Sequence, residues 1–190
     1  MKRIMNYELR IKNSEKGYTL VELLAVMIIL ISVGAVMIAI LVTSLRGGNK
    51  SNTTNEVRQN GDYIISQMSK MIAYSKSFGG VKTTLAGTYI TDCTAVSSPP
   101  TAYKYIKITS FDDGVTEFSC TGSTIASGTA DLIDTTKFTV SDCNFYCSQV
   151  NTTSPATINV LFTLSKKNSG FFAENQTTIP FDTTITLRNY

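Results

Sequence analysis

A single apolar run near the N-terminus limits what this chain can fold into more than any other feature. Between Lys16 and Arg46 the only side chain charged at neutral pH is Glu22, and the unbroken aliphatic stretch LLAVMIILI follows it. As a helix the run would be about 39 Å long, which exceeds the ~30 Å hydrocarbon core of a bilayer. The sequence therefore predicts a membrane-spanning helix over residues 18–46.

The net charge of the chain lies in front of this helix. The first 17 residues, MKRIMNYELRIKNSEKG, contain five Lys or Arg and two Asp or Glu, which accounts for the whole formal charge of +3. Positive charge before the span and a long polar region after it predict a cytoplasmic N-terminus and an external body. We expect a single-pass protein of the cytoplasmic (inner) membrane in contact with lipid. A secretory signal peptide fits less well, because its apolar core is shorter and ends at a cut site of small residues.

The composition argues against an enzyme. The chain has no histidine, the usual general base near neutral pH and the commonest metal ligand, which removes catalytic triads and most zinc sites. No pair of Asp or Glu suggests carboxylate catalysis. Beyond the leader the charges of the two signs balance, so there is no strong nucleic-acid signal. We expect no catalytic residue and no cofactor.

Glu22 needs an explanation, because it lies at the start of an otherwise uncharged span. An acidic side chain inside a bilayer costs about 2.5 to 3.5 kcal/mol on insertion scales, so it usually indicates a partner or a function. The alternative is a carboxylate near the headgroups that is merely tolerated.

The residues around Glu22 resemble a known signal. A short basic leader ending in Gly17, followed by YTLVEL at the head of a long apolar helix, is similar to the class III signal of type IV prepilins and pseudopilins. Tyr18 stands where that family most often has Phe. The resemblance implies that a prepilin peptidase removes residues 1–17 by cutting between Gly17 and Tyr18, and then methylates the new amine of Tyr18.

The resemblance also implies a role for the carboxylate. When subunits stack into a filament, Glu22 would pair with the N-terminal ammonium of Tyr18 on a neighbour, and breaking such a buried pair is costly. The implied partners are other pilin or pseudopilin subunits and an inner-membrane assembly platform. The implied location is the membrane and then a pilus or pseudopilus.

Two softer patterns refine this expectation. The segments NEVRQNGDYIISQMSKMIAYSKSF and TTITLRN resemble those of minor pseudopilins of the J type and related minor pilins, which implies a minor structural subunit of a type IV pilus or a type II secretion pseudopilus. The alternatives are a tip adhesin or binding module on the same anchor, a competence (DNA-uptake) pilin, and a membrane-tethered enzyme whose leader stays uncut.

A second helical pattern follows the span. Apolar residues at spacings of three, four and seven predict an amphipathic continuation of the helix over residues 47–80, and Gly79-Gly80 suits a left-handed C-cap. Whether the helix passes through Gly47-Gly48 is left open, since glycine is unfavourable in a helix interior. The stripe contains Val57, Gly61, Ile64, Ile65, Met68, Met71 and Ile72.

Residues 81–190 predict a Thr/Ser-rich antiparallel β domain. The alternating segment AYKYIKITS, the turn Asp112-Asp113-Gly114 and the segment VTEFSC predict a hairpin. Further strands are predicted at residues 137–141, 158–164 and 183–187. A long N-terminal helix whose apolar stripe is covered by an antiparallel sheet is an α+β fold, and the pilin fold is similar.

Four cysteines lie in the predicted external part, where disulfides persist. Of the three possible connectivities we favour Cys93–Cys120 and Cys143–Cys147. The second requires a turn at residues 144–146, because cysteines four apart on an extended strand are about 13 Å apart. A metal site is the alternative, but the spacing lacks paired C-x-x-C motifs, so we expect no metal.

Two further groups are candidate ligand sites. Asp112, Asp113 and Glu117 would supply oxygen ligands to calcium, although hairpin-turn chemistry explains them better. Tyr103 and Tyr105 would stack on a ligand, although a half-buried sheet is the better expectation.

Overall fold

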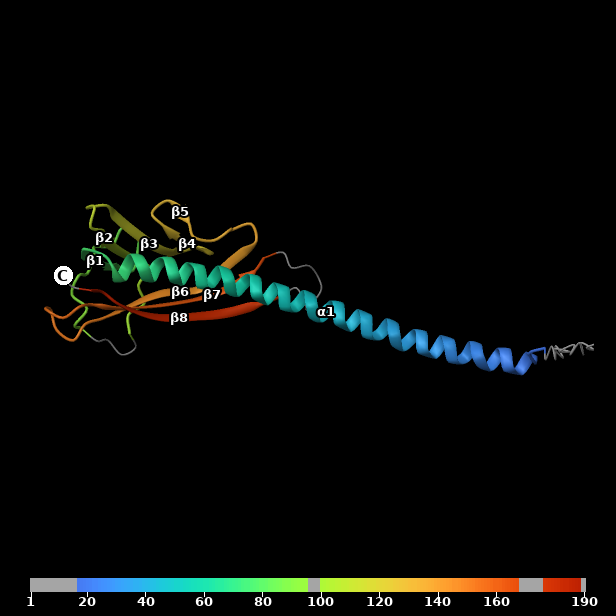
Figure 1. Ribbon diagram of the computed structural model, residues 1–190. Helices are drawn as coiled ribbons and strands as arrows, with labels where there is room; N and C mark the ends of the chain where they lie inside the picture. Colours follow the sequence, from blue (N-terminus) through green and yellow to red (C-terminus); the bar gives the residue numbers. More distant parts are fainter. Residues whose placement is uncertain (1–16, 96–99, 168–175, 189–190) are drawn as a thin grey trace, which may run out of the picture. The chain divides into compact units, whose positions relative to one another are not determined.

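The computed structural model describes residues 17–95, 100–167 and 176–188, which form one α-helix and eight β-strands in an α+β arrangement (Figure 1). The chain divides into two compact units, residues 1–45 and 46–190. The elements are α1 (Leu20–Ala73), β1 (Ser77–Lys82), β2 (Tyr105–Thr109), β3 (Val115–Thr121), β4 (Thr124–Ser127), β5 (Ala130–Asp131), β6 (Phe138–Ser148), β7 (Thr157–Lys166) and β8 (Thr178–Thr186).

The first unit contains the start of α1. The helix begins after Thr19, whose hydroxyl oxygen accepts a hydrogen bond from the backbone N–H of Glu22 at 3.2 Å. Threonine is a favoured N-cap, and a Glu three residues later matches the capping-box pattern. The helix start is therefore specified locally by the same residues that resemble a prepilin signal.

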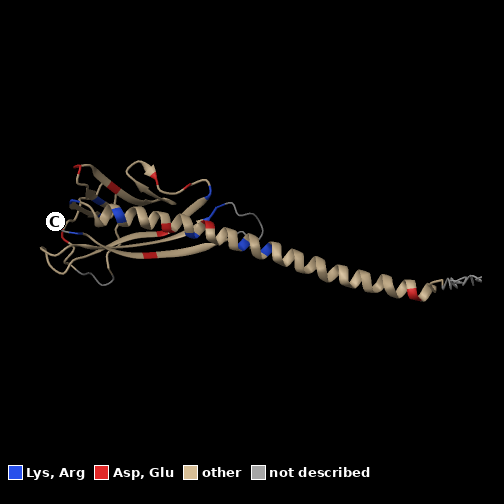
Figure 2. Cartoon of the chain, viewed as in Figure 1, with Lys and Arg blue, Asp and Glu red and all other residues tan. Residues whose placement is uncertain are grey.

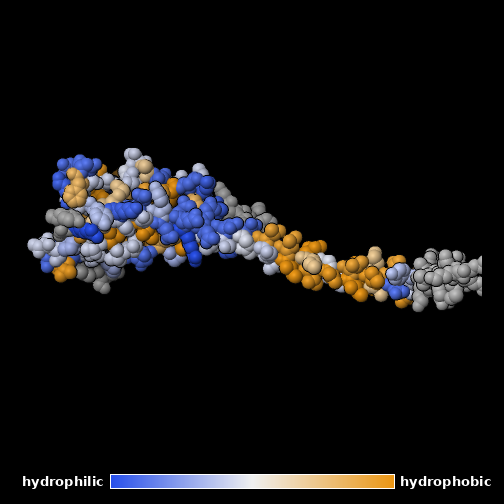
Figure 3. Space-filling model, viewed as in Figure 1, coloured by the Kyte–Doolittle hydropathy of each residue, from blue (hydrophilic) through white to orange (hydrophobic). Residues whose placement is uncertain are grey.

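The rest of α1 in this unit, up to residue 45, is mostly apolar and exposed. A long stretch of α1 has no Lys, Arg, Asp or Glu (Figure 2), and its surface is hydrophobic (Figure 3). Its few hydroxyl groups bond within the helix, with Ser32 Oγ donating to the Ile29 carbonyl and Thr43 Oγ1 to the Ala39 carbonyl, both at 2.8 Å. The helix is long and apolar enough to cross a membrane, as predicted.

The second unit contains the remainder of α1 and both sheets. The helix assignment has no break at Gly47 or Gly48. The predicted stripe is confirmed: one hydrophobic core joins α1 to both sheets, and Ile65 and Met71 pack partly buried against it. The buried helix residues are Thr53, Val57, Gly61, Ile64, Met68 and Ile72.

Two antiparallel sheets enclose this core. One has the strand order β1-β2-β3-β4-β5 and the other β6-β7-β8. The hairpin predicted around Asp112-Asp113-Gly114 is present as β2 and β3, with Thr109 opposite Val115. The three later strands are also present and longer than predicted: β6 continues to Ser148, β7 extends at both ends, and β8 begins at Thr178.

The predicted end of the helix was wrong. The helix ends at Ala73 rather than near residue 80. Just after this end, Ser75 Oγ donates a hydrogen bond to the Ile72 carbonyl at 2.9 Å. Gly79-Gly80 is therefore no C-cap. The pair lies inside β1, where the pairing with β2 is irregular between Phe78 and Gly80, and Gly80 has φ 104°. A β-bulge with a residue at positive φ needs glycine for the same reason as a C-cap.

Candidate functional site

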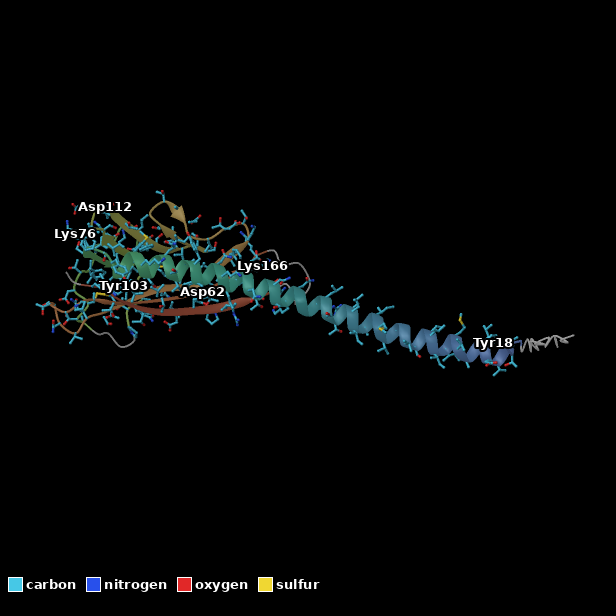
Figure 4. All side chains as sticks on the ribbon, viewed as in Figure 1. Tyr18, Asp62, Lys76, Tyr103, Asp112 and Lys166 are labelled. Atoms are coloured by element: carbon cyan, nitrogen blue, oxygen red, sulfur yellow. A yellow bond between two sulfur atoms is a disulfide. The ribbon has the colours of Figure 1, made fainter. Side chains whose placement is uncertain are left out.

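The three residues of the predicted processing and assembly site lie together at the start of α1. Gly17 and Tyr18 precede the helix and are exposed, Tyr18 by 82%. Glu22 is in the first turn, where the helix dipole favours a negative charge. Figure 4 shows Tyr18 at the beginning of α1. Most of the predicted leader, residues 1–16, lies outside the described residues.

The bond between Gly17 and Tyr18 lies in an exposed segment without regular secondary structure. A Cβ built on Gly17 would have no neighbour within 4 Å. The capping arrangement gives Glu22 one local role, which is to favour the helix start. Glu22 is exposed, and among the described residues no cation pairs with its carboxylate.

The disulfides differ from those expected. Cys93 pairs with Cys147 and Cys120 with Cys143, so the favoured pairs Cys93–Cys120 and Cys143–Cys147 were wrong. All four cysteines are bridged.

The reason is that Cys143 and Cys147 both lie in strand β6, which keeps them too far apart to bridge. Cys147 is bridged to Cys93 in the segment before Tyr103, and Cys143 is bridged to Cys120 in β3. The chain after Cys93 returns to β6 at Tyr103, which exchanges backbone hydrogen bonds with Phe145 at 2.8 and 2.9 Å. Near Cys143, Val140 N–H donates to the Ser123 carbonyl at 2.8 Å and ties β6 to the β3–β4 hairpin.

The acidic hairpin turn uses its carboxylates internally. Asp112 Oδ1 accepts from Gly114 N–H at 3.1 Å, and Asp113 forms an ion pair with Lys76 at 2.5 Å, near the turn in Figure 4. Glu117 forms an ion pair with Lys82 at 3.1 Å. Within the described ranges no three potential metal-ligating side chains come together, and these three carboxylates serve the turn and the lysines.

The structure separates the two candidate tyrosines. Tyr105 is buried in β2, where the Lys82 ammonium lies 4.7 Å from its ring centroid and 4.5 Å from that of Tyr89. Tyr103 lies instead beside β6. Tyr105 is therefore part of the sheet, which was the favoured expectation, and its burial rules it out as a residue that stacks on a ligand.

Tyr103 borders a cavity of about 460 Å³ on the three-stranded sheet, which the sequence did not predict. Asn159 from β7 donates to Asp182 Oδ1 from β8 at 2.6 Å and to Thr184 Oγ1 at 3.2 Å. Asn159 lies in the predicted strand 158–164, but Asp182 precedes the predicted strand 183–187, so the sequence did not indicate that the two side chains would meet. The lining residues are Ala95, Pro100, Thr101, Tyr103, Tyr146, Cys147, Ser148, Asn159, Leu161 and Asp182.

Comparisons with known proteins found no relative of this chain. No protein-family model, no curated protein and no solved structure matches the chain. Its function is therefore argued from the residues and geometry of the chain itself.

Proposed function

We propose that this chain is a structural, minor subunit of a type IV pilus or type II secretion pseudopilus. In this proposal prepilin peptidase cuts between Gly17 and Tyr18, and the mature chain is polymerised through its N-terminal helix. The observation that carries the proposal is the GYTLVE motif at the capped start of an exposed apolar helix, which is followed by a disulfide-bonded β domain.

The exposed apolar surface of α1 supports assembly. Its side chains from Leu20 to Leu45 are exposed in the single chain, so they need lipid before assembly and other apolar helices afterwards. The membrane supplies the first of these surroundings, and a filament of packed helices supplies the second.

Glu22 gives the packing a register. In a helical stack its carboxylate pairs with the Tyr18 ammonium of a neighbouring subunit. Leaving one of two such charges unpaired in an apolar core costs about 3–5 kcal/mol. Misaligned subunits are therefore disfavoured.

The β domain supports an external location for the second unit. Disulfides persist in oxidising compartments and are rare in the cytosol, and both bridges lie between residues 93 and 147. The charge of the leader favours the same orientation, with the N-terminus in the cytoplasm.

The first test is the N-terminus of the chain in its own cell. We expect intact-protein mass spectrometry to find a chain that begins at Tyr18 and contains one added methyl group. A chain that retains residues 1–17 in cells with an active prepilin peptidase would contradict the proposal.

The second test separates assembly from processing. Glu22→Gln keeps the size of the side chain and removes its charge, so we expect normal cleavage but at least about a tenfold loss from sheared filaments. Asp62→Asn is the matched control, because Asp62 is an exposed carboxylate further along α1 (Figure 4). Equal incorporation of both variants would show that Glu22 has no assembly role.

A further inference from the structure

We infer that the cavity on the β6–β8 sheet is a binding site for a neutral saccharide. This inference goes beyond the filament role and does not depend on it. The floor of the cavity is set by strand register: Tyr146 lies opposite Asn159, and Leu161 lies opposite Asp182. These four side chains occupy adjoining positions on one face of the sheet.

That face points away from the core. The alternate residues of β7, Ile158, Val160 and Phe162, are fully buried against the core of the domain. Because successive side chains of a strand point to opposite faces, Asn159 and Leu161 are presented outward. Neither of them is needed to complete the hydrophobic core.

Two described residues at the edge of the cavity are held in place. Tyr103 exchanges two backbone hydrogen bonds with Phe145 in β6. Cys147, also in β6, is bridged to Cys93. These two lining residues are therefore positioned before a ligand arrives, which lowers the entropic cost of binding.

The polar groups of the floor mainly offer hydrogen-bond acceptors. The 2.6 Å bond from Asn159 Nδ2 to Asp182 Oδ1 orients the pair, and the Asn159 carbonyl and the second Asp182 oxygen are left to accept bonds from hydroxyl groups. Tyr146 and Leu161 provide apolar surface beside them. A sugar ring has both complements, a rim of hydroxyl donors and an apolar C–H face.

Other ligand classes fit less well. No Lys or Arg is among the described residues that line the cavity, so an anion would face the Asp182 carboxylate without compensation. A purely apolar ligand would bury Asp182 and Asn159 without hydrogen bonds, which is costly. An organic cation would satisfy Asp182 but leave the hydroxyl of Ser148, which also lines the cavity, without a hydrogen-bond acceptor. The volume of about 460 Å³ lies in the range of small-molecule sites.

The test uses the full chain in an amphipol, because many common detergents themselves contain sugar or choline groups. Saturation-transfer NMR is recorded with D-glucose, D-galactose, D-mannose, N-acetyl-D-glucosamine and lactose, and with choline chloride and sodium phosphate as comparators. We expect at least one neutral sugar to bind with a millimolar or lower Kd, and neither comparator to compete with it.

Variants locate the binding. We expect Tyr146→Ala and Asp182→Ala each to weaken sugar binding about tenfold. The first removes the apolar surface for the sugar ring, and the second removes an acceptor for its hydroxyl groups. Tyr146→Phe retains the ring and should bind within about threefold of the unsubstituted chain, which also guards against misfolding of the alanine variant. The matched controls Tyr63→Ala and Asp62→Ala lie on the exposed face of α1 and should leave the Kd unchanged.

Three outcomes would overturn the inference. The first is that no sugar of the panel binds, and the second is that choline or phosphate binds in preference to every sugar. The third is that a sugar binds equally well to the Tyr146→Ala, Asp182→Ala and control variants. None of these outcomes bears on cleavage at Gly17 or on the assembly role of Glu22.

Discussion

Gly61 shows how one residue allows α1 to approach strand β8. A Cβ at this position would overlap the ring of Phe181, which is itself stacked on Phe162 with 5.1 Å between ring centroids. We expect Gly61→Ala to lower the free energy of unfolding by about 1–3 kcal/mol through overpacking. This loss exceeds the gain of up to about 1 kcal/mol from the higher helix propensity of alanine. Urea unfolding followed by near-UV circular dichroism measures the difference.

Gly48 provides the matched control for Gly61. It lies in the same helix, and a Cβ there would have no neighbour within 4 Å. Gly48→Ala should therefore leave the domain unchanged or stabilise it by up to about 1 kcal/mol. If the two alanine variants were equally stable, the close packing of Gly61 against Phe181 would be refuted.

Asp134 gives a prediction about pH. The Thr136 hydroxyl donates to Asp134 Oδ1 at 2.5 Å and the Thr136 N–H donates at 3.0 Å, and these bonds hold the pKa of Asp134 below its usual 3.8. A lowered pKa means that the bonds stabilise the fold above the pKa of the unfolded chain. The stabilisation is lost as pH falls through the folded pKa.

Thr136→Val removes the hydroxyl donor, which is the larger cause of this shift. We expect the pKa of Asp134 to rise toward 3.8 in an NMR titration of the side-chain carboxyl resonances. Thr94→Val is the control, because Thr94 bonds Asp92 in the same way and should raise only the pKa of Asp92. An unchanged Asp134 titration in Thr136→Val would show that the hydroxyl bond is absent in solution.

At the scale of elements, sequence patterns correctly predicted those helices and turns that are specified by interactions between residues close in the chain. The stripe from Val57 to Ile72 and the turn at Asp112-Asp113-Gly114 were correct because side-chain periodicity and turn chemistry specify them. The end of α1 was wrong because a Gly-Gly pair suits both a C-cap and a bulge. The pairing of β1 with β2, which no local pattern encodes, decided between them.

Gly80 tests this explanation of the bulge. Its φ is 104°, and a Cβ there would lie 2.6 Å from the Ile90 carbonyl oxygen. We expect Gly80→Ala to destabilise the domain by about 1–3 kcal/mol in urea unfolding, because the strained backbone cannot relax away from Ile90. Gly122 also has positive φ, at 62°, but open space around it, so Gly122→Ala should cost less. If Gly80→Ala and Gly122→Ala lowered the free energy of unfolding equally, backbone strain alone would explain the loss and the close approach to Ile90 would play no part.

At the scale of the whole molecule, the sequence predicted groups that are close in the chain and missed groups that the fold brings together. Gly17, Tyr18 and Glu22 form one short motif, so the sequence alone was enough to propose them as a site. The saccharide cavity combines residues from Ala95 to Asp182, and nothing in either segment indicates the other. The cysteine pairs failed for the same reason, since only the long strand β6 excludes Cys143–Cys147.

The nested disulfides give the last prediction. Cys93–Cys147 spans 54 residues and encloses Cys120–Cys143, which spans 23. The chain-entropy relation gives stabilisations of roughly 4 and roughly 3 kcal/mol for loops of these lengths. Replacing each pair by serines should therefore lower the free energy of unfolding by about these amounts, the Cys93/Cys147 pair by more.

Peptide mapping tests the connectivity without any substitution, provided that the chain is cut between Cys143 and Cys147. Trypsin leaves both in one peptide, because the segment from Phe138 to Ser165 has no Lys or Arg. Chymotrypsin separates them by cutting after Phe145 or Tyr146. Under non-reducing conditions we expect one linked pair that contains Cys93 with Cys147 and another that contains Cys120 with Cys143. A linked Cys93–Cys120 peptide would contradict this arrangement, because Cys93 could then not be bridged to Cys147 in strand β6.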